Sequence, residues 1–152
     1  MKQLLLGFLL PLCSLHINAQ TDNPVYDKAM ADSLGGDDYG MKPYVLVILK
    51  TGTAKIDNNQ VSDSLFKGHM TAIQKFADDG KLIVSGPLRK NEKAYRGIFI
   101  LDVKTIEEAQ VLLQSDPAIY AKVFDVELFQ WYGSAALPLY LPNHYKIEKK
   151  KM

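Results

Sequence analysis

Apolar and polar residues follow the periods of strands and helices across the middle of the chain. Four short stretches are apolar or alternate at every second residue, as β-strands do, and they cover residues 44–49, 81–85, 95–101 and 123–132. Two further stretches, residues 62–79 and 106–113, repeat apolar residues at helical spacing. The order predicts an α+β, ferredoxin-like β-α-β-β-α-β fold, in which two helices cover one face of a four-stranded antiparallel sheet.

Residues that cap helices lie at the ends of both helical stretches. Ser62 or Asp63 can accept hydrogen bonds from the first N–H groups of the longer helix, and Gly80 can take the left-handed conformation after its end. Thr105 and Glu108 have the spacing of a capping box. These residues place the helix boundaries independently of the apolar pattern.

Segments of different composition flank this region and divide the chain. Residues 20–42 form an acidic lead-in, with a short helix expected over residues 25–34. The predicted domain covers residues 43–132, and residues 133–152 form a C-terminal extension. The extension contains an apolar stretch, residues 137–142, whose prolines are expected to exclude regular structure. Its apolar character predicts packing over the domain edge or onto a partner subunit.

The N-terminus has the layout of a secretion signal. Lys2 supplies a positive charge, residues 4–12 are mostly apolar, and Ala19 is a small residue at the expected cut. We therefore expect residues 1–19 to be a cleaved signal peptide and the protein to be periplasmic or secreted. Nine residues are too few to span ~30 Å of hydrocarbon as a helix. An uncleaved anchor, or a lipid on Cys13, are the alternatives.

Cleavage would change the composition in two ways. Cys13 is the only cysteine, so the mature chain would have no disulfide, thiol nucleophile or cysteine metal ligand. Loss of Lys2 would leave 17 basic and 17 acidic residues. A chain without net charge has no general attraction for nucleic acid, and we expect no nucleic-acid partner and no membrane span after cleavage.

The second face of the predicted sheet is also apolar. The first and third strands, residues 44–49 and 95–101, have apolar residues on both sides, although the helices cover only one. An apolar sheet face needs a cover, and a second copy packed sheet against sheet supplies it. We therefore predict a homodimer. The alternative is that the lead-in and the C-terminal extension cover this face within one chain.

One pair of residues suggests acid–base chemistry. His69 falls within the apolar stripe of the longer helix, where its ring needs a polar partner. Asp116 follows the second helix, which lies beside the first in this fold. An imidazole held by a carboxylate is a general acid–base unit near neutral pH. The alternatives are a structural histidine bonded to the backbone and an Asp116 that, before Pro117, only caps a helix turn.

Three segments resemble the hallmark sequences of the YCII-related (YciI-like) family. They are Gly68-His69-Met70, then Gly80-Lys81-Leu82-Ile83-Val84-Ser85-Gly86-Pro87, and Ser115-Asp116-Pro117. The resemblance covers about residues 43–132. It implies a ferredoxin-like fold, a dimeric α/β barrel, and a catalytic dyad of His69 and Asp116. One branch of the family removes chloride from an aromatic ring, and the wider fold includes muconolactone isomerases and small monooxygenases.

Other residues are candidates for substrate binding. They are Ser85 near the Gly-Pro turn, Arg96 on the third strand, which could bind an anion, and Tyr120 near the aspartate. Each also has a purely structural interpretation, as a strand-end, edge or surface residue. The two histidines of the mature chain, His69 and His144, do not make a metal site by themselves, and no nucleotide-binding or nucleophile motif is present.

The leading hypothesis is a cofactor-free lyase or isomerase acting on a small organic molecule, because elimination and isomerisation need neither a redox group nor a nucleophile. A non-catalytic ligand-binding module and a purely structural dimer are the alternatives. A structural role predicts a filled core beside His69, whereas both functional hypotheses predict a cavity there.

Overall fold

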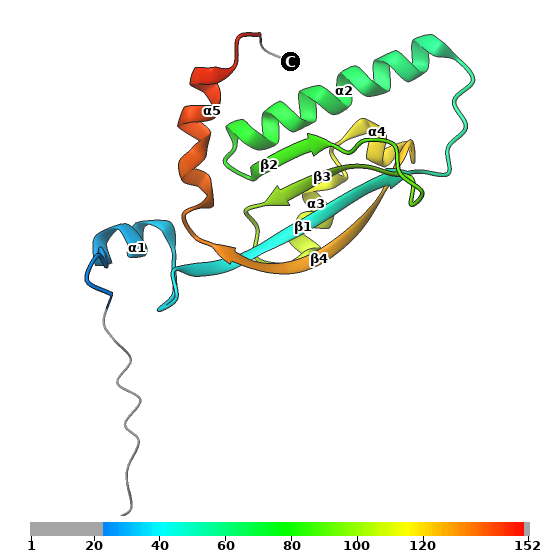
Figure 1. Cartoon of the computed structure of the whole chain (residues 1–152). Helices are drawn as coiled ribbons and strands as arrows, with labels where there is room; N and C mark the ends of the chain where they lie inside the picture. The colour runs from blue at the N-terminus through cyan, green and yellow to red at the C-terminus, as the bar shows by residue number, and fades with distance from the viewer. Residues whose placement is uncertain (1–22, 151–152) are drawn as a thin grey trace, which may run out of the picture.

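The computed structural model describes residues 23–150 and contains one four-stranded antiparallel sheet of order β2-β3-β1-β4 (Figure 1). Its strands are β1 (Met41–Thr51), β2 (Leu82–Pro87), β3 (Tyr95–Leu101) and β4 (Phe124–Ser134). The helices α2 (Asn59–Asp78), α3 (Ile106–Leu113) and the short α4 (Pro117–Tyr120) connect the strands and cover one face. The predicted ferredoxin-like arrangement is confirmed. The expected signal peptide, residues 1–19, lies outside the described residues.

The core forms between this sheet and the helices. In β1, Val47 pairs with Phe99 of β3 on one side and with Leu128 of β4 on the other, so the three side chains share the helix-covered face. Val47 and Phe99 are buried there against Phe76 of α2. Every second residue of the strands and one face of the helix therefore contribute their apolar side chains to the same core layer.

Helix α2 begins earlier than its capping pattern suggests. The prediction that Ser62 or Asp63 caps it was wrong, because Asn58 is the N-cap and its side-chain oxygen accepts from the N–H groups of Gln60 and Val61 at 2.9 and 3.2 Å. Asparagine in an extended conformation satisfies the same unpaired donors one turn sooner. At the other end Gly80 has φ +68°, the left-handed conformation expected of it.

Helix α3 has one of the two hydrogen bonds that a capping box predicts. The Thr105 hydroxyl accepts from the N–H of Glu108 at 3.1 Å. The Glu108 carboxylate, however, accepts from the N–H of Lys104, one residue before the cap, at 3.0 Å. The start of the helix is therefore closed by two side chains, as the sequence indicates.

The lead-in contains a helix that packs little on the domain. Helix α1 (Lys28–Leu34) starts three residues after the expected boundary, because Asp27 caps it through the N–H of Met30. No residue of α1 is buried, and Figure 1 shows it projecting beyond the sheet.

The C-terminal extension is helical, so the expectation that its prolines exclude regular structure was wrong. It contains the 3-10 helix η1 (Leu137–Tyr140) and the helix α5 (Leu141–Ile147), each with a proline in its first positions. Proline has no N–H, and the first helical positions need none. The Tyr140 hydroxyl donates to the carbonyl of Ile83 in β2, which places the extension against the edge of the sheet.

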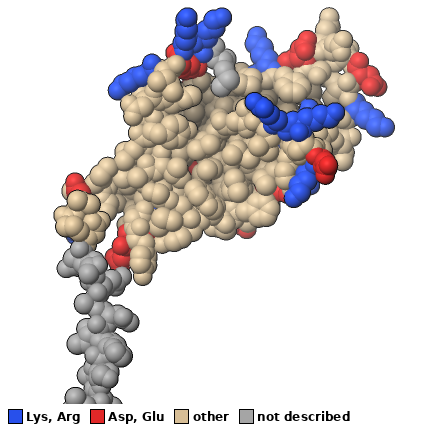
Figure 2. Space-filling view, in the orientation of Figure 1, with Lys and Arg blue, Asp and Glu red and all other residues tan. Residues whose placement is uncertain are grey.

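The sheet face opposite the helices carries few charges over its centre. In Figure 2 most charged side chains lie along the upper and right-hand margins of the molecule, and the broad middle of the view has few. Partly or largely exposed apolar residues occupy this open face, and they are Leu46, Ile48, Val84, Ile98, Ile100 and Phe129. None of the helices within residues 23–150 is both long and apolar enough to cross a membrane.

Candidate functional site

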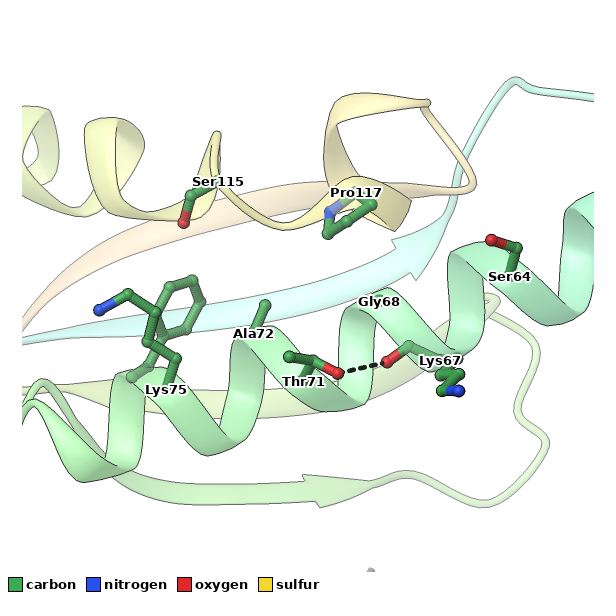
Figure 3. Close-up of a pocket in the computed structure, with 9 residues that line it drawn as sticks. Ser64, Lys67, Gly68, Thr71, Ala72, Lys75, Ser115 and Pro117 are labelled. Carbon is green, nitrogen blue, oxygen red and sulfur yellow. Dashed lines mark hydrogen bonds between the residues drawn. The ribbon is translucent and has the colours of Figure 1, made fainter.

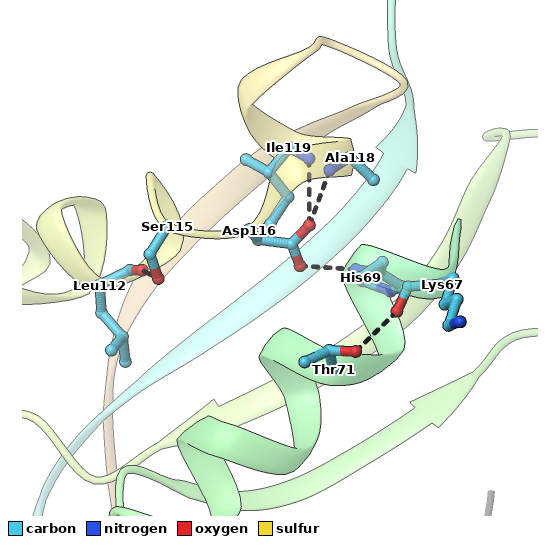
Figure 4. A network of polar contacts seen from close by, with 8 residues as sticks. All are labelled: Lys67, His69, Thr71, Leu112, Ser115, Asp116, Ala118 and Ile119. Atoms are coloured by element: carbon cyan, nitrogen blue, oxygen red, sulfur yellow. Dashed lines mark hydrogen bonds and ion pairs between the residues drawn. The ribbon is translucent and has the colours of Figure 1, made fainter. Parts of the chain in front are cut away.

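His69 and Asp116, which are 47 residues apart in sequence, meet inside the domain (Figure 4). The Nδ1 atom of His69 lies 2.5 Å from Oδ2 of Asp116. The Asp116 side chain is fully buried and that of His69 is 8% exposed. The other carboxylate oxygen, Oδ1, accepts from the N–H groups of Ala118 and Ile119 at 2.9 and 3.3 Å. Both carboxylate oxygens of Asp116 therefore have hydrogen-bond partners.

Local sequence explains why Asp116 is so well fixed. Asp116 is the N-cap of α4, and Pro117 occupies the first helical position, where its ring pre-sets the backbone angle. One carboxylate oxygen completes this cap, and the second is left free to bind His69. The capping role and the pairing with histidine, considered as alternatives from the sequence, are performed together by the two oxygens.

Gly68 allows the two helices to approach closely enough for this pair. A Cβ atom at this position would lie 2.8 Å from Cγ of Pro117, closer than such atoms pack. Figure 3 shows Pro117 facing this part of α2. Glycine immediately before His69 therefore has a steric purpose: it brings α2 against α4 and the imidazole within reach of the carboxylate.

Aromatic rings hold the imidazole plane. The ring of His69 stacks on Phe99 with centroids 6.1 Å apart and an interplanar angle of 27°, and it lies 5.0 Å from the ring of Phe124. An ionised carboxylate can only accept, so the Nδ1 proton of His69 points to Asp116. In a neutral ring this tautomer makes Nε2 a hydrogen-bond acceptor, which is the form that a general base requires.

A cavity of about 490 Å³ adjoins the ring of His69. Its volume falls within the range of small-molecule sites. Its lining is mostly apolar and includes Leu49, Phe66, Met70, Ile73, Leu88, Phe99 and Phe124. The filled core that a purely structural role predicts beside His69 is therefore absent from this part of the described chain.

The cavity brings together four of the five residues selected from the sequence. Ser85 and Arg96 line it with His69, and Asp116 lies behind the imidazole. Tyr120 is not brought to the site: it is 77% exposed on α4 and is not among the lining residues. It follows the cap by four residues, so proximity in sequence to Asp116 did not mean proximity to the cavity.

Two apolar wall residues of the cavity, Phe66 and Met70, were predicted only as part of the apolar pattern of the longer helix. Phe66 and Met70 lie one turn before and one residue after His69, and they remain 44% and 37% exposed. Both side chains line the cavity beside His69, which accounts for their exposure. Their helical spacing around His69 was visible in the sequence, but their exposure was not.

A second hollow of about 440 Å³ lies between α2 and α4, on the other side of this contact (Figure 3). Two of its hydroxyl groups are already bonded within their own segments, Thr71 to the carbonyl of Lys67 and Ser115 to that of Leu112. Neither His69 nor Asp116 lines it. Within residues 23–150, no group of three or more histidine, cysteine or carboxylate side chains is placed to hold a metal ion.

Comparison with known proteins identifies the domain. A search of curated proteins finds no match to this chain. Among solved structures, the chain is similar to 5-chloro-2-hydroxyhydroquinone dehydrochlorinase from Burkholderia phenoliruptrix AC1100, with 16% identity over 57% of this chain and 92% of that chain, at a TM-score of 0.42. Residues 43–132 match the model of the YCII-related domain, which is more than half of the sequence. The chain therefore belongs to the YCII-related family.

Proposed function

We propose that this protein is a cofactor-free acid–base enzyme of the lyase or isomerase type, acting on a small organic molecule. The observation that carries the proposal is the 2.5 Å pair of His69 and Asp116 at the wall of a cavity of ligand size. A buried carboxylate that fixes the tautomer of an imidazole, next to an open space, is the arrangement that general base catalysis uses.

The proposed step moves one proton at Nε2 of His69. This atom accepts a proton from an acidic C–H bond of the substrate, and the electron pair of that bond remains on the substrate as an enolate or forms a double bond. Asp116 stabilises the imidazolium that results. The same proton is then returned to a different carbon in an isomerisation, or to solvent after a leaving group departs in an elimination.

Deuterium exchange tests the chemistry before the substrate is known. A general base exchanges the acidic C–H of a bound ligand with solvent even when turnover does not follow. Small ketones, lactones and phenols are incubated with the protein in D₂O, and incorporation is followed by NMR. We expect wild-type protein to accelerate exchange of at least one compound and His69→Gln to lose this acceleration while the compound still binds.

A non-catalytic ligand-binding module is the second candidate, favoured by the predominantly apolar lining of the cavity. A thermal-shift screen on wild-type protein, repeated on His69→Ala, separates the two candidates when combined with the exchange assay. Compounds that stabilise the wild type but show no exchange, and that lose binding in His69→Ala, support a module. Retained binding with lost exchange supports the enzyme.

The location and assembly of the protein belong to the same proposal. We propose that residues 1–19 are a cleaved signal peptide and that the protein is periplasmic or secreted, on the basis of Lys2 and the apolar residues 4–12. Intact mass of the protein from cell fractions tests this: a chain that starts at Gln20 supports it, and a full-length chain in the membrane fraction supports the anchor. We also propose a homodimer formed through the open sheet face.

A further inference from the structure

Strand β2 contains a bulge that changes which sheet face its polar residue occupies. Between Leu82 and Val84 the pairing with β3 shifts by one residue, and Ile83 is the extra residue. Strict alternation from the buried Leu82 would direct Ser85 to the open face of the sheet. With the bulge, Ser85 pairs with Phe99 and lies on the helix-covered face instead.

Strand β3 contains a second bulge with the same effect. Lys50 of β1 pairs with Tyr95, whereas the preceding β1 residue pairs with Gly97, so Arg96 is the extra residue. Alternation from Gly97 would direct Arg96 to the open face. Instead Tyr95 takes the open face and Arg96 lines the cavity that contains His69. Bulges redirect side chains and recur beside functional sites.

The two bulges therefore direct a hydroxyl and a guanidinium to the rim of one apolar cavity. Ser85 and Arg96 are both exposed, whereas His69 and Phe99 are buried at its floor. No carboxylate and no lysine is among the described residues that line the cavity. Within residues 23–150, the Arg96 guanidinium also has no carboxylate within ion-pair distance. A cation is thus placed at a ligand-sized site whose described lining residues include no counter-charge.

We propose that the cavity takes a small ring compound with one carboxylate group, which Arg96 binds with the help of Ser85. A guanidinium offers two parallel N–H donors that match the two oxygens of a carboxylate. One cation in the lining fits one negative charge. The rings of Phe66, Phe99 and Phe124 fit a flat apolar body. This substrate class rests on the function proposed above, because it places the anionic end at the rim and a C–H bond near His69.

Binding of benzoate, benzamide and benzylamine tests this class, because the three probes share a ring and differ in charge. Their affinities are measured by calorimetry, together with the NMR shifts of the His69 ring. We expect benzoate to bind wild-type protein at least about tenfold more tightly than either other probe. Arg96→Gln should weaken benzoate about ten- to a hundredfold and leave benzamide unchanged, and Arg96→Lys should restore part of the loss.

Arg89 provides the matched control. It is the only other arginine of the sequence, it is exposed between β2 and β3, and it does not line the cavity. Arg89→Gln should leave the affinity for benzoate unchanged. Equal weakening by the two variants would mean that only the general charge matters and would overturn the proposal. Equal binding of benzoate and benzamide, or no benzoate binding by folded wild-type protein, would also overturn it.

Failure of the underlying function gives a different result. If benzoate binds through Arg96 but His69→Gln changes no deuterium exchange, the substrate class stands as a ligand class and the enzyme does not. If His69 catalyses exchange of neutral compounds and Arg96→Gln has no effect, the acid–base function stands and the carboxylate assignment is overturned.

Discussion

At the residue scale, the site depends on how one carboxylate divides its two oxygens. Oδ1 of Asp116 completes the cap of α4, and Oδ2 binds Nδ1 of His69. Capping alone would need a single oxygen, and serine or asparagine performs it as well. The second oxygen is what the acid–base proposal uses, so a substitution that keeps the cap and removes the charge separates the structural purpose of Asp116 from the catalytic one.

Asp116→Asn is that substitution. Asparagine caps helices well, so we expect the free energy of unfolding to fall by no more than about 1 kcal/mol. With its oxygen on the α4 N–H groups, its amide would donate to Nδ1 of His69 and force the proton onto Nε2, the wrong tautomer for a base. The rate of His69-dependent exchange should fall about 10⁴-fold. Denaturant unfolding and the D₂O assay measure the two effects, and a loss of stability with unchanged exchange would contradict the prediction.

At the element scale, the C-terminal extension supports the strand that carries Ser85. The Tyr140 hydroxyl of η1 donates to the carbonyl of Ile83, the extra residue of the β2 bulge. A bulge leaves backbone groups without a ladder partner, and Ile83 is buried, so its carbonyl needs another donor. The C-terminal extension thus supplies a hydrogen bond that helps to hold the bulged backbone of β2.

Tyr140→Phe removes this bond and keeps the ring. We expect a loss of about 0.5–1.5 kcal/mol in the free energy of unfolding, and faster amide hydrogen exchange at Val84 and Ser85. Tyr145→Phe is the control, because Tyr145 lies in the neighbouring α5, is 50% exposed, and has no hydrogen-bond partner among the described residues. Identical behaviour of the two variants would show that the bond to Ile83 does not hold the bulge.

A second element-scale feature is an ionic cluster on the open face. Glu127 of β4 accepts from Lys50 at 3.0 Å and from the Tyr95 hydroxyl at 3.1 Å. The hydrogen bonds from Lys50 and then Tyr95 lower the pKa of Glu127 below its ordinary value. A lowered carboxyl pKa stabilises the fold above the pKa of the unfolded chain, and this stabilisation is lost as the pH falls through the folded pKa.

Lys50→Met should therefore raise the pKa of Glu127 toward its ordinary value. NMR titration of the Glu127 carboxyl carbon measures the change directly. The variant should also lose less stability than wild-type protein between neutral and acidic pH, because less of its stability depends on ionised Glu127. Lys55→Met, in the loop after β1, should change neither quantity, and a Glu127 titration that is the same in all three proteins would contradict the prediction.

At the scale of the whole molecule, the periodic patterns predicted the order of helices and strands, which depends on core packing. They did not predict the bulges or the helix ends, which depend on local backbone geometry. The order of elements follows from apolar periods, and the pairing of His69 with Asp116 follows from helices that lie side by side. The bulges could not be predicted, because a shift of one residue leaves no mark on composition and yet reverses the face of Ser85 and Arg96. Helix ends also depend on exact position. Asn58 caps α2 although later residues could have done so, and Pro142 is accepted in α5 because it lies in the first turn.

The open face of the sheet has an apolar centre. Leu46, Ile48, Ile98 and Ile100 lie on this face in one continuous apolar patch, with β1 paired to β3. Helix α1 has no buried residue, and the extension bonds to the edge strand β2, so neither is placed to cover the centre of this patch. A stable two-fold contact needs about 800 Å² from each partner, and a sheet face of four strands offers an area of that order. We therefore expect wild-type protein to run at twice its chain mass in light scattering.

Ile98→Lys tests whether this face forms the contact. Two-fold symmetry would bring a lysine from each copy toward the same apolar layer, where an unpaired charge is costly to bury, so the variant should shift to the monomer mass at micromolar concentration. Ile147→Lys, in the 80% exposed end of α5, adds the same charge elsewhere and should stay dimeric. A wild-type monomer would contradict the dimer, and a dimeric Ile98→Lys would move the contact away from the sheet. Tyr95 and Arg96 are neighbours in β3 but lie on opposite faces of the sheet. The affinity of monomeric Ile98→Lys for benzoate, compared with that of the wild type, would therefore show whether the site depends on the second copy.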